Sequence, residues 1–203
     1  MRAGFRGMPF AALCATLAAF LGACASDMQI HDAIVDVNRA FQTEYEKILA
    51  EDGTRTYPVP PKVAFAAAVR VMQRLGMRPA DAAPDLGYLN VYAPAPAPLS
   101  AEEWRRASEA DLPKLRSIAA QHVGMLSYFI GFEPEGLEIV INVTTLESSG
   151  GTEISLTTRM REVAAPRSGI PRREYPPPTG VRIALGKIWQ ELDGELAGAK
   201  IGR

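Results

Sequence analysis

Two long segments in the C-terminal half alternate between apolar and polar residues, and they constrain the fold more than any other feature of the sequence. They are Leu137–Glu147 and Thr152–Val163, joined by the sequence SSGG. A short connection that contains glycine favours an antiparallel hairpin. Side chains alternate between the two faces of a strand, so we expect a buried face and a solvated face. In the second segment the buried face is predicted to hold Ile154, Leu156, Thr158 and Met160.

A helix is predicted near the N-terminus. Ser26 and Gln29 have the spacing of a helix capping box, and the helix should end before Gly53. Its apolar residues recur every three or four positions and form a stripe. This stripe is expected to pack on the protein's own domain, although a spacer, a partner-binding surface or self-association stays open. Its residues are Ile30, Ile34, Val37, Phe41, Tyr45 and Ile48.

A strand, a helix and further strands follow. Thr54–Val59 is predicted to be extended, and Pro60-Pro61 should lead into a helix that stops near Gly76. Met77–Ala83 is expected to be extended but interrupted by prolines, and Tyr88–Ala93 has the composition of a strand after a turn.

The middle of the chain is predicted to hold a two-part helical insertion at 99–123. The stretch 94–98 is rich in proline and is expected to be an extended spacer. Ser100 and Glu103 form a second capping box, and Pro113 should interrupt the helix that they open. The very apolar stretch Gly124–Phe132 is expected to be a buried strand or short helix, with a membrane-touching or ligand-lining loop as the alternative.

The last helix completes an α+β fold class. Its stripe should consist of Val181, Leu185, Ile188, Leu192 and Leu196, with Trp189 beside it. We therefore predict a small antiparallel sheet covered by helices on one face, with a long C-terminal helix. The predicted organisation is a signal segment at 1–23, an N-terminal helical segment at 24–53, one α+β domain at 54–199 and a tail at 200–203.

The first residues have the order of a secretory signal. Arg2 and Arg6 precede the apolar run Phe10–Leu21, and small residues lead to Cys24. The run is much shorter than the roughly 20 residues that cross a bilayer. Ordinary signal cleavage, which would release a soluble protein, and a cytoplasmic protein with an apolar N-terminus remain alternatives.

The sequence Leu21-Gly22-Ala23-Cys24 resembles the lipobox of bacterial lipoprotein precursors. This resemblance implies a diacylglycerol thioether and a further acyl chain, such as palmitate, on Cys24. Several acyl chains anchor a protein stably, whereas one binds reversibly. Ala25 takes the place of the aspartate associated with inner-membrane retention, which implies a periplasm-facing position on the outer membrane.

Charge balance and cysteine content argue against a nucleic-acid binder and against a disulfide. The chain has 203 residues with 22 basic and 23 acidic side chains, and the predicted signal removes two of the basic ones. This balance does not favour a nucleic-acid binder. Processing would separate the two cysteines, Cys14 and Cys24, so no disulfide is expected within the mature chain.

The sequence offers little support for catalysis, and no cofactor is expected. His31 and His122 are too few for a zinc site, and no nucleophile motif is present. Glu133 and Glu135 are a close carboxylate pair, which we interpret as solvating a turn rather than hydrolysing glycans. A basic cluster is a candidate contact for phosphate groups or an acidic partner, although solvated side chains beside acids are the simpler interpretation. It comprises Arg159, Arg161, Arg167, Arg172 and Arg173.

The order of elements over 54–199 is similar in outline to helix-grip domains, which occur in lipoprotein accessory subunits of outer-membrane β-barrel assembly machinery. The similarity rests on no motif, so no functional residue is transferred from it. We expect a membrane-anchored periplasmic lipoprotein that serves as a non-enzymatic accessory or scaffold in an envelope complex and has an envelope protein as its partner. The alternative is a module that holds a lipid or small apolar ligand between the sheet and the last helix, lined by Gly124–Phe132. The oligomeric state stays open.

Overall fold

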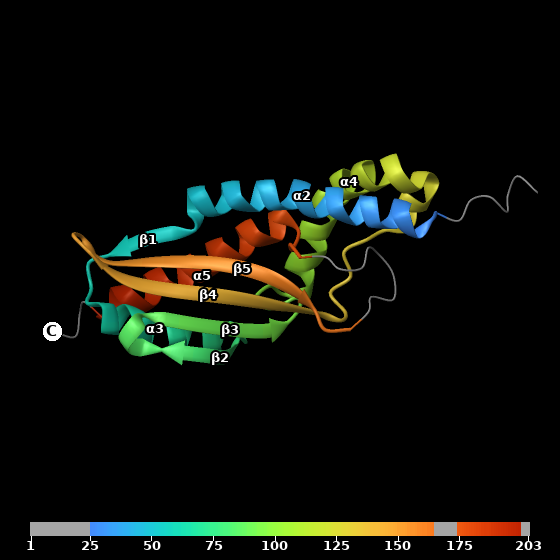
Figure 1. Ribbon diagram of the computed structural model, residues 1–203. Coiled ribbons are helices and arrows are strands. Elements are labelled where there is room, and N and C mark those ends of the chain that lie inside the picture. The colour runs from blue at the N-terminus through green and yellow to red at the C-terminus, as the bar shows by residue number, and fades with distance from the viewer. Residues whose placement is uncertain (1–24, 165–173, 200–203) are drawn as a thin grey trace, which may run out of the picture.

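The computed structural model describes residues 25–164 and 174–199, and it has the predicted α+β architecture. Five antiparallel strands form one sheet in the order β1-β5-β4-β3-β2 (Figure 1). The strands are β1 (Thr54–Tyr57), β2 (Arg78–Ala83), β3 (Tyr88–Pro94), β4 (Leu137–Ser148) and β5 (Gly151–Glu162). The helices are α2 (Asp27–Asp52), α3 (Pro61–Arg74), α4 (Ala101–Val123) and α5 (Pro178–Ala199), with 3-10 turns η1 (Pro84–Leu86) and η2 (Gly124–Phe129).

The β4–β5 hairpin is confirmed, and it forms the centre of the sheet. Its register runs from Leu137 opposite Glu162 to Ser148 opposite Gly151. Gly151 has a φ of +124°, and a Cβ there would lie 2.2 Å from the carbonyl oxygen of Tyr57. Glycine is therefore required where the hairpin meets β1.

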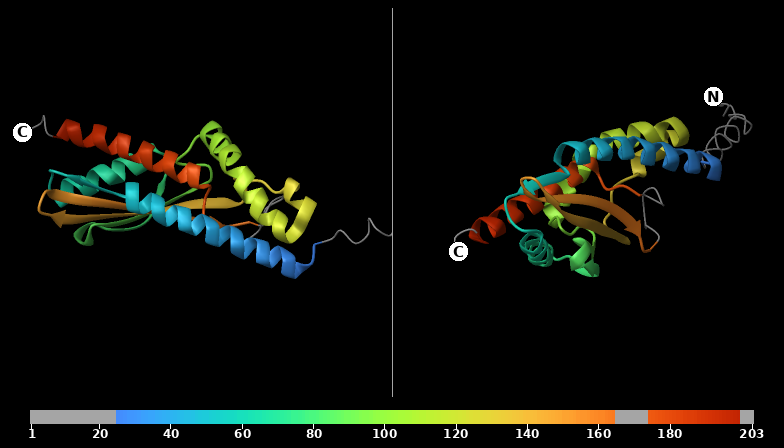
Figure 2. Two further views of the ribbon diagram at one scale, coloured as in Figure 1. Left: turned by 90° about the horizontal axis from the view of Figure 1, so that it is seen from above. Right: turned by 60° about the vertical axis from the view of Figure 1, so that its left-hand side comes forward.

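One face of the sheet is buried against α3 and α5, whereas the other face is open (Figures 1 and 2). The predicted alternation along β5 is confirmed, because Ile154, Leu156, Thr158 and Met160 are all buried. The predicted stripe of α5 is buried as well, and Trp189 is only 1% exposed. Apolar burial of this kind is the main favourable contribution to folding.

α2 packs on the rest of the protein along most of its length. Both hydrogen bonds of the Ser26–Gln29 capping box are present, and Gly53 caps the other end, as predicted. Val37 and Phe41 pack with Leu115 of α4 in a second apolar cluster, while farther along the helix Ile48 enters the main core. The buried part of the stripe is therefore an intramolecular contact. Ile30, near the start of the helix, is 38% exposed.

Pro113 does not divide the predicted insertion, because α4 is one continuous helix with this proline inside it. A proline removes one backbone hydrogen bond. Packing on both sides of Pro113 holds the helix together, since Trp104 and Ala107 are buried before it and Leu115 and Ala119 after it. The predicted capping box of Ser100 and Glu103 is present.

Two other local predictions were wrong. The stretch 94–98 is a folded connection rather than a spacer: the Ala95 amide donates to Leu137 and the alanines pack on the core. Most of Gly124–Phe132 is not core but surface, as Met125 and Phe129 are 83% and 80% exposed. Side chains of α3 and α5 already fill the core against the sheet. The apolar sequence of this turn was therefore not enough to bury it.

None of the helices in the described parts of the chain combines the length and apolarity that spanning a bilayer requires.

Candidate functional site

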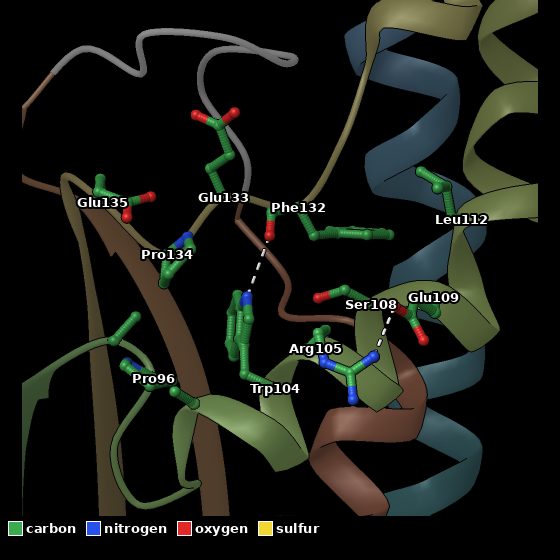
Figure 3. Close-up of a pocket in the computed structure, with 12 residues that line it drawn as sticks. Pro96, Trp104, Arg105, Ser108, Glu109, Leu112, Phe132, Glu133, Pro134 and Glu135 are labelled. Atoms are coloured by element: carbon green, nitrogen blue, oxygen red, sulfur yellow. Dashed lines mark hydrogen bonds and ion pairs between the residues drawn. The ribbon is translucent and has the colours of Figure 1, made fainter.

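A hollow lies between α4, the β3–α4 connection and the segment that enters β4 (Figure 3). We call it the α4 pocket, and its volume is about 850 Å³. Its walls are mainly apolar, with Trp104, Leu112, Phe132 and Pro134 facing it. The volume falls within the roughly 300–1,000 Å³ of typical ligand sites.

Trp104 fixes the shape of the α4 pocket. Its indole N–H donates to the carbonyl oxygen of Phe132 at 3.0 Å, and the side chain is only 5% exposed. The Phe132 ring stacks on Phe41 of α2, with the ring centroids 5.7 Å apart. α2, α4 and the segment before β4 are therefore held together around the pocket.

Two polar contacts attach α4 to α5 behind the pocket. The Asp111 carboxylate accepts hydrogen bonds from the Thr179 amide at 2.8 Å and from the Thr179 hydroxyl at 2.7 Å. Burial nevertheless raises the pKa of Asp111. Lys187 donates to Glu103 at 3.0 Å, and the pKa of Glu103 is lowered by the Ser100 backbone N–H and then by Lys187.

Charged side chains form the rim of the pocket. Arg105 pairs with Glu109 at 2.9 Å and with Glu102 at 3.2 Å, so its positive charge is offset within α4. Glu133 and Glu135, the predicted carboxylate pair, also line the pocket, and Figure 3 shows them on the side opposite α4. Among the described lining residues, Glu109, Glu133 and Glu135 are acidic and Arg105 is basic.

Ser108 contributes a polar group inside the pocket. Its Oγ is buried, and in the described parts of the chain it is the one buried side-chain polar atom without a hydrogen-bond partner. Figure 3 shows this hydroxyl between the rings of the pocket and Arg105. A hydroxyl can donate or accept, so this buried group has hydrogen-bonding capacity that the described residues leave unused.

Neither of the two predicted arginines among the described residues, Arg159 and Arg161, lines the α4 pocket. Arg159 and Arg161 lie on the open face of the sheet, where Arg161 forms an ion pair with Glu138. Arg167, Arg172 and Arg173 lie outside the described residues, as does Cys24.

The histidines are not part of the pocket either. His122 Nε2 lies 3.0 Å from the Asp36 carboxylate, so α2 supplies an acid that the sequence did not reveal. His31 is exposed on α2. Within residues 25–164 and 174–199, no three His, Cys, Asp or Glu side chains are grouped as metal ligands.

The space between the sheet and α5 is much smaller than a ligand site. It measures about 20 Å³ and is bounded by Ile139 and Val181 among others. A space of roughly 10–15 Å³ holds one water, so this one has room for about one water and none for a ligand. Within Gly124–Phe132, only Phe132 reaches the α4 pocket, and none reaches the space under α5.

Sequence reasoning missed the α4 pocket, because its walls come from segments separated in sequence. Trp104 and Phe132 are 28 residues apart, and each looked like an ordinary core residue. A polar residue, Ser108, one turn after Trp104 on an otherwise buried face was the available signal.

Comparison with family models, with curated proteins and with solved structures found no match for this chain.

Proposed function

We propose that this protein is a lipid-anchored envelope lipoprotein on the periplasmic side of the outer membrane. In this role it is a non-enzymatic accessory subunit that binds a segment of a partner protein in the α4 pocket. The observation that carries the proposal is that very few residues separate the lipobox from the folded domain. Only Ala25 and Ser26 separate Cys24 from the first residue of α2, and α2 is part of the apolar core.

The short connection between Cys24 and α2 limits the distance between the domain and the membrane. Three residues of extended chain reach about 10 Å, so a lipid on Cys24 would hold the domain against the membrane surface. A long flexible linker would instead allow the domain to search a large volume. The arrangement suits a subunit that stays close to a membrane complex.

The α4 pocket supports binding of a protein segment. Its apolar wall around Trp104 can hold an apolar side chain. Glu135 on the rim favours lysine or arginine beside that apolar residue, because opposite charges steer association and select partners. Among the described residues that line the pocket, none is a histidine or a cysteine.

The proposal can be tested in intact cells by crosslinking the full-length protein, separating the inner and outer membranes, and identifying what co-purifies. Mass spectrometry of the mature N-terminus reports whether Cys24 carries lipid, and Cys24→Ser is the control. We expect recovery of one envelope complex from the outer membrane. Recovery only from the soluble fraction, with unmodified Cys24, would reject the proposal.

Charge reversal tests the pocket itself. Glu135→Lys changes the rim, whereas Glu147→Lys makes the same change on an exposed position of the β4–β5 hairpin, outside the pocket. The first variant should lose the partner severalfold while the second retains it, since charges at the edge of an interface mainly alter the association rate. Equal recovery of the partner with both variants would contradict the binding of the partner in the α4 pocket.

A ligand-binding module is the second candidate, favoured by the volume and apolar walls of the α4 pocket. In this alternative the ligand occupies that pocket and not the small space under α5. A native mass spectrum of the detergent-solubilised protein distinguishes the two functions. A retained small molecule that Trp104→Ala releases would favour the ligand module.

A further inference from the structure

The turn η2 exposes a cluster of large apolar side chains. Four of its six residues are large, apolar and exposed, namely Met125 at 83%, Leu126 at 40%, Tyr128 at 68% and Phe129 at 80%. Ser127 is the residue of the turn that points inward, with 2% exposure. Contiguous exposed apolar patches of this kind mark interaction surfaces.

The position of η2 relates it to the proposed anchor. Figures 1 and 2 show η2 and the N-terminal end of α2 at the same end of the molecule. Residues 27–32 at that end of α2 are all exposed, and Met28 is 73% exposed. A lipid on Cys24 would lie within about 10 Å of the start of α2, so the same end of the molecule faces the membrane.

A cationic side chain lies next to the apolar turn. Arg116 of α4 lines a hollow of about 410 Å³ together with Met125 and Tyr128. Its Nε donates to the carbonyl oxygen of Ile130 at 3.3 Å, and among the described residues it forms no ion pair with a carboxylate. Arginine binds phosphate oxygens well, because its planar guanidinium offers several donors.

We propose that η2 enters the interfacial layer of the bilayer, an inference that rests on the lipid anchor of the proposed function. Met125, Leu126 and Phe129 would lie among the upper acyl carbons. Tyr128 has an apolar ring and a polar hydroxyl, which suits the boundary between acyl chains and headgroups. Arg116 would lie at the level of the lipid phosphates. Insertion of this kind reaches roughly 5–10 Å into the boundary.

This second contact fixes the orientation of the domain. An acyl anchor on Cys24 alone leaves the protein free to rotate about a tether of two residues. With η2 also in the bilayer, the long axis of α2 and the mouth of the α4 pocket take one orientation relative to the membrane. A partner would then meet the pocket in a defined geometry, which lowers the entropy lost on binding.

The test uses single cysteines, since lipidation would consume the Cys24 thiol and Cys14 would leave with the signal. Leu126→Cys places a polarity-sensitive dye in η2 and keeps the other three apolar side chains. Ser149→Cys places the same dye on the β4–β5 turn, which is exposed at the opposite end of the molecule. Both lipoproteins are reconstituted in phosphatidylethanolamine and phosphatidylglycerol vesicles, with and without brominated acyl chains.

We expect the dye at position 126 to shift to the blue and to be quenched by brominated lipid, with no change at position 149. Replacing Met125, Tyr128 and Phe129 together by serine should abolish the quenching while Cys24 stays lipidated. Equal responses from the dyes at positions 126 and 149 would contradict the insertion of η2 into the bilayer. A blue shift without quenching by bromine would assign η2 to contact between two copies of the chain instead.

The unsubstituted chain separates the failure of this inference from failure of the anchor. If Cys24 is lipidated, that chain takes up no dye, and the response at position 126 alone decides whether η2 enters the bilayer. If the unsubstituted chain takes up dye at Cys24, this cysteine carries no lipid and the anchor is rejected. The contact of η2 with the bilayer then loses the anchor on which it rests.

Discussion

The indole N–H of Trp104 donates to the backbone carbonyl of Phe132 at 3.0 Å, and this bond joins α4 to the segment that leads into β4. A similar bond lies elsewhere in the molecule, where the Trp189 indole donates to the carbonyl of Asp52 at 2.7 Å. Each tryptophan therefore connects its helix to the backbone of a segment distant in sequence. Only the bond of Trp104 borders the α4 pocket.

Replacing Trp104 by phenylalanine should lower the free energy of unfolding by about 1–3 kcal/mol, because the Phe132 carbonyl is left without its donor. Denaturant unfolding measures this change. Hydrogen exchange should show faster opening of residues 130–136. Trp189→Phe is the matched control, expected to destabilise the protein without the local effect. Equal exchange in this segment for both variants would contradict the role of Trp104 in shaping the pocket.

Phe41→Ala should cost about 3–5 kcal/mol in the free energy of unfolding, a typical value for removing a buried aromatic ring. Phe41 is 2% exposed and stacks on Phe132. Val35→Ala, at a position of α2 that is 38% exposed, should stay within about 0.5 kcal/mol. Thermal or denaturant unfolding measures both. Similar small effects from the two variants would mean that α2 does not dock as described.

Asp111 should make stability fall as the pH rises through the acid range. Its pKa is raised in the folded protein, chiefly by burial, so the folded state binds more protons than the unfolded state above the ordinary aspartate pKa of about 3.9. Stability therefore decreases as the pH increases from that value through the folded pKa. Asp111→Asn should flatten this part of the pH profile. Asp85→Asn, at an exposed turn position, should leave the slope as it is.

Glu195 should have the opposite dependence on pH. Arg70 at 2.7 Å and Arg74 at 2.6 Å lower its pKa, so its contribution is present above the ordinary glutamate pKa of about 4.3 and is lost as the pH falls. The stability difference between the wild type and Glu195→Gln should be largest near neutral pH. It should shrink in acid and in high salt, which screens exposed pairs. If the stability difference between the two proteins changed with neither pH nor salt, its origin in these ion pairs would be contradicted.

The sequence alone predicted the elements whose stability is decided locally. The capping boxes at Ser26 and Ser100 predicted where α2 and α4 begin, because a cap uses residues three positions apart. The alternation along β5 and the stripe of α5 predicted which side chains are buried. Where one residue opposed its neighbours, as Pro113 does in α4, packing with other segments decided the outcome and the local prediction failed.

The residues that surround the candidate sites came together only in the tertiary structure. Trp104, Ser108 and Phe132 form one pocket because α4 folds back against the segment before β4, and no local pattern encodes that approach. η2 is exposed because α3 and α5 already fill the core, so its apolar sequence did not determine its position. Local propensity and periodicity thus determined the α+β elements of this protein. Competition among distant segments for the same buried volume decided its pocket and its apolar surface.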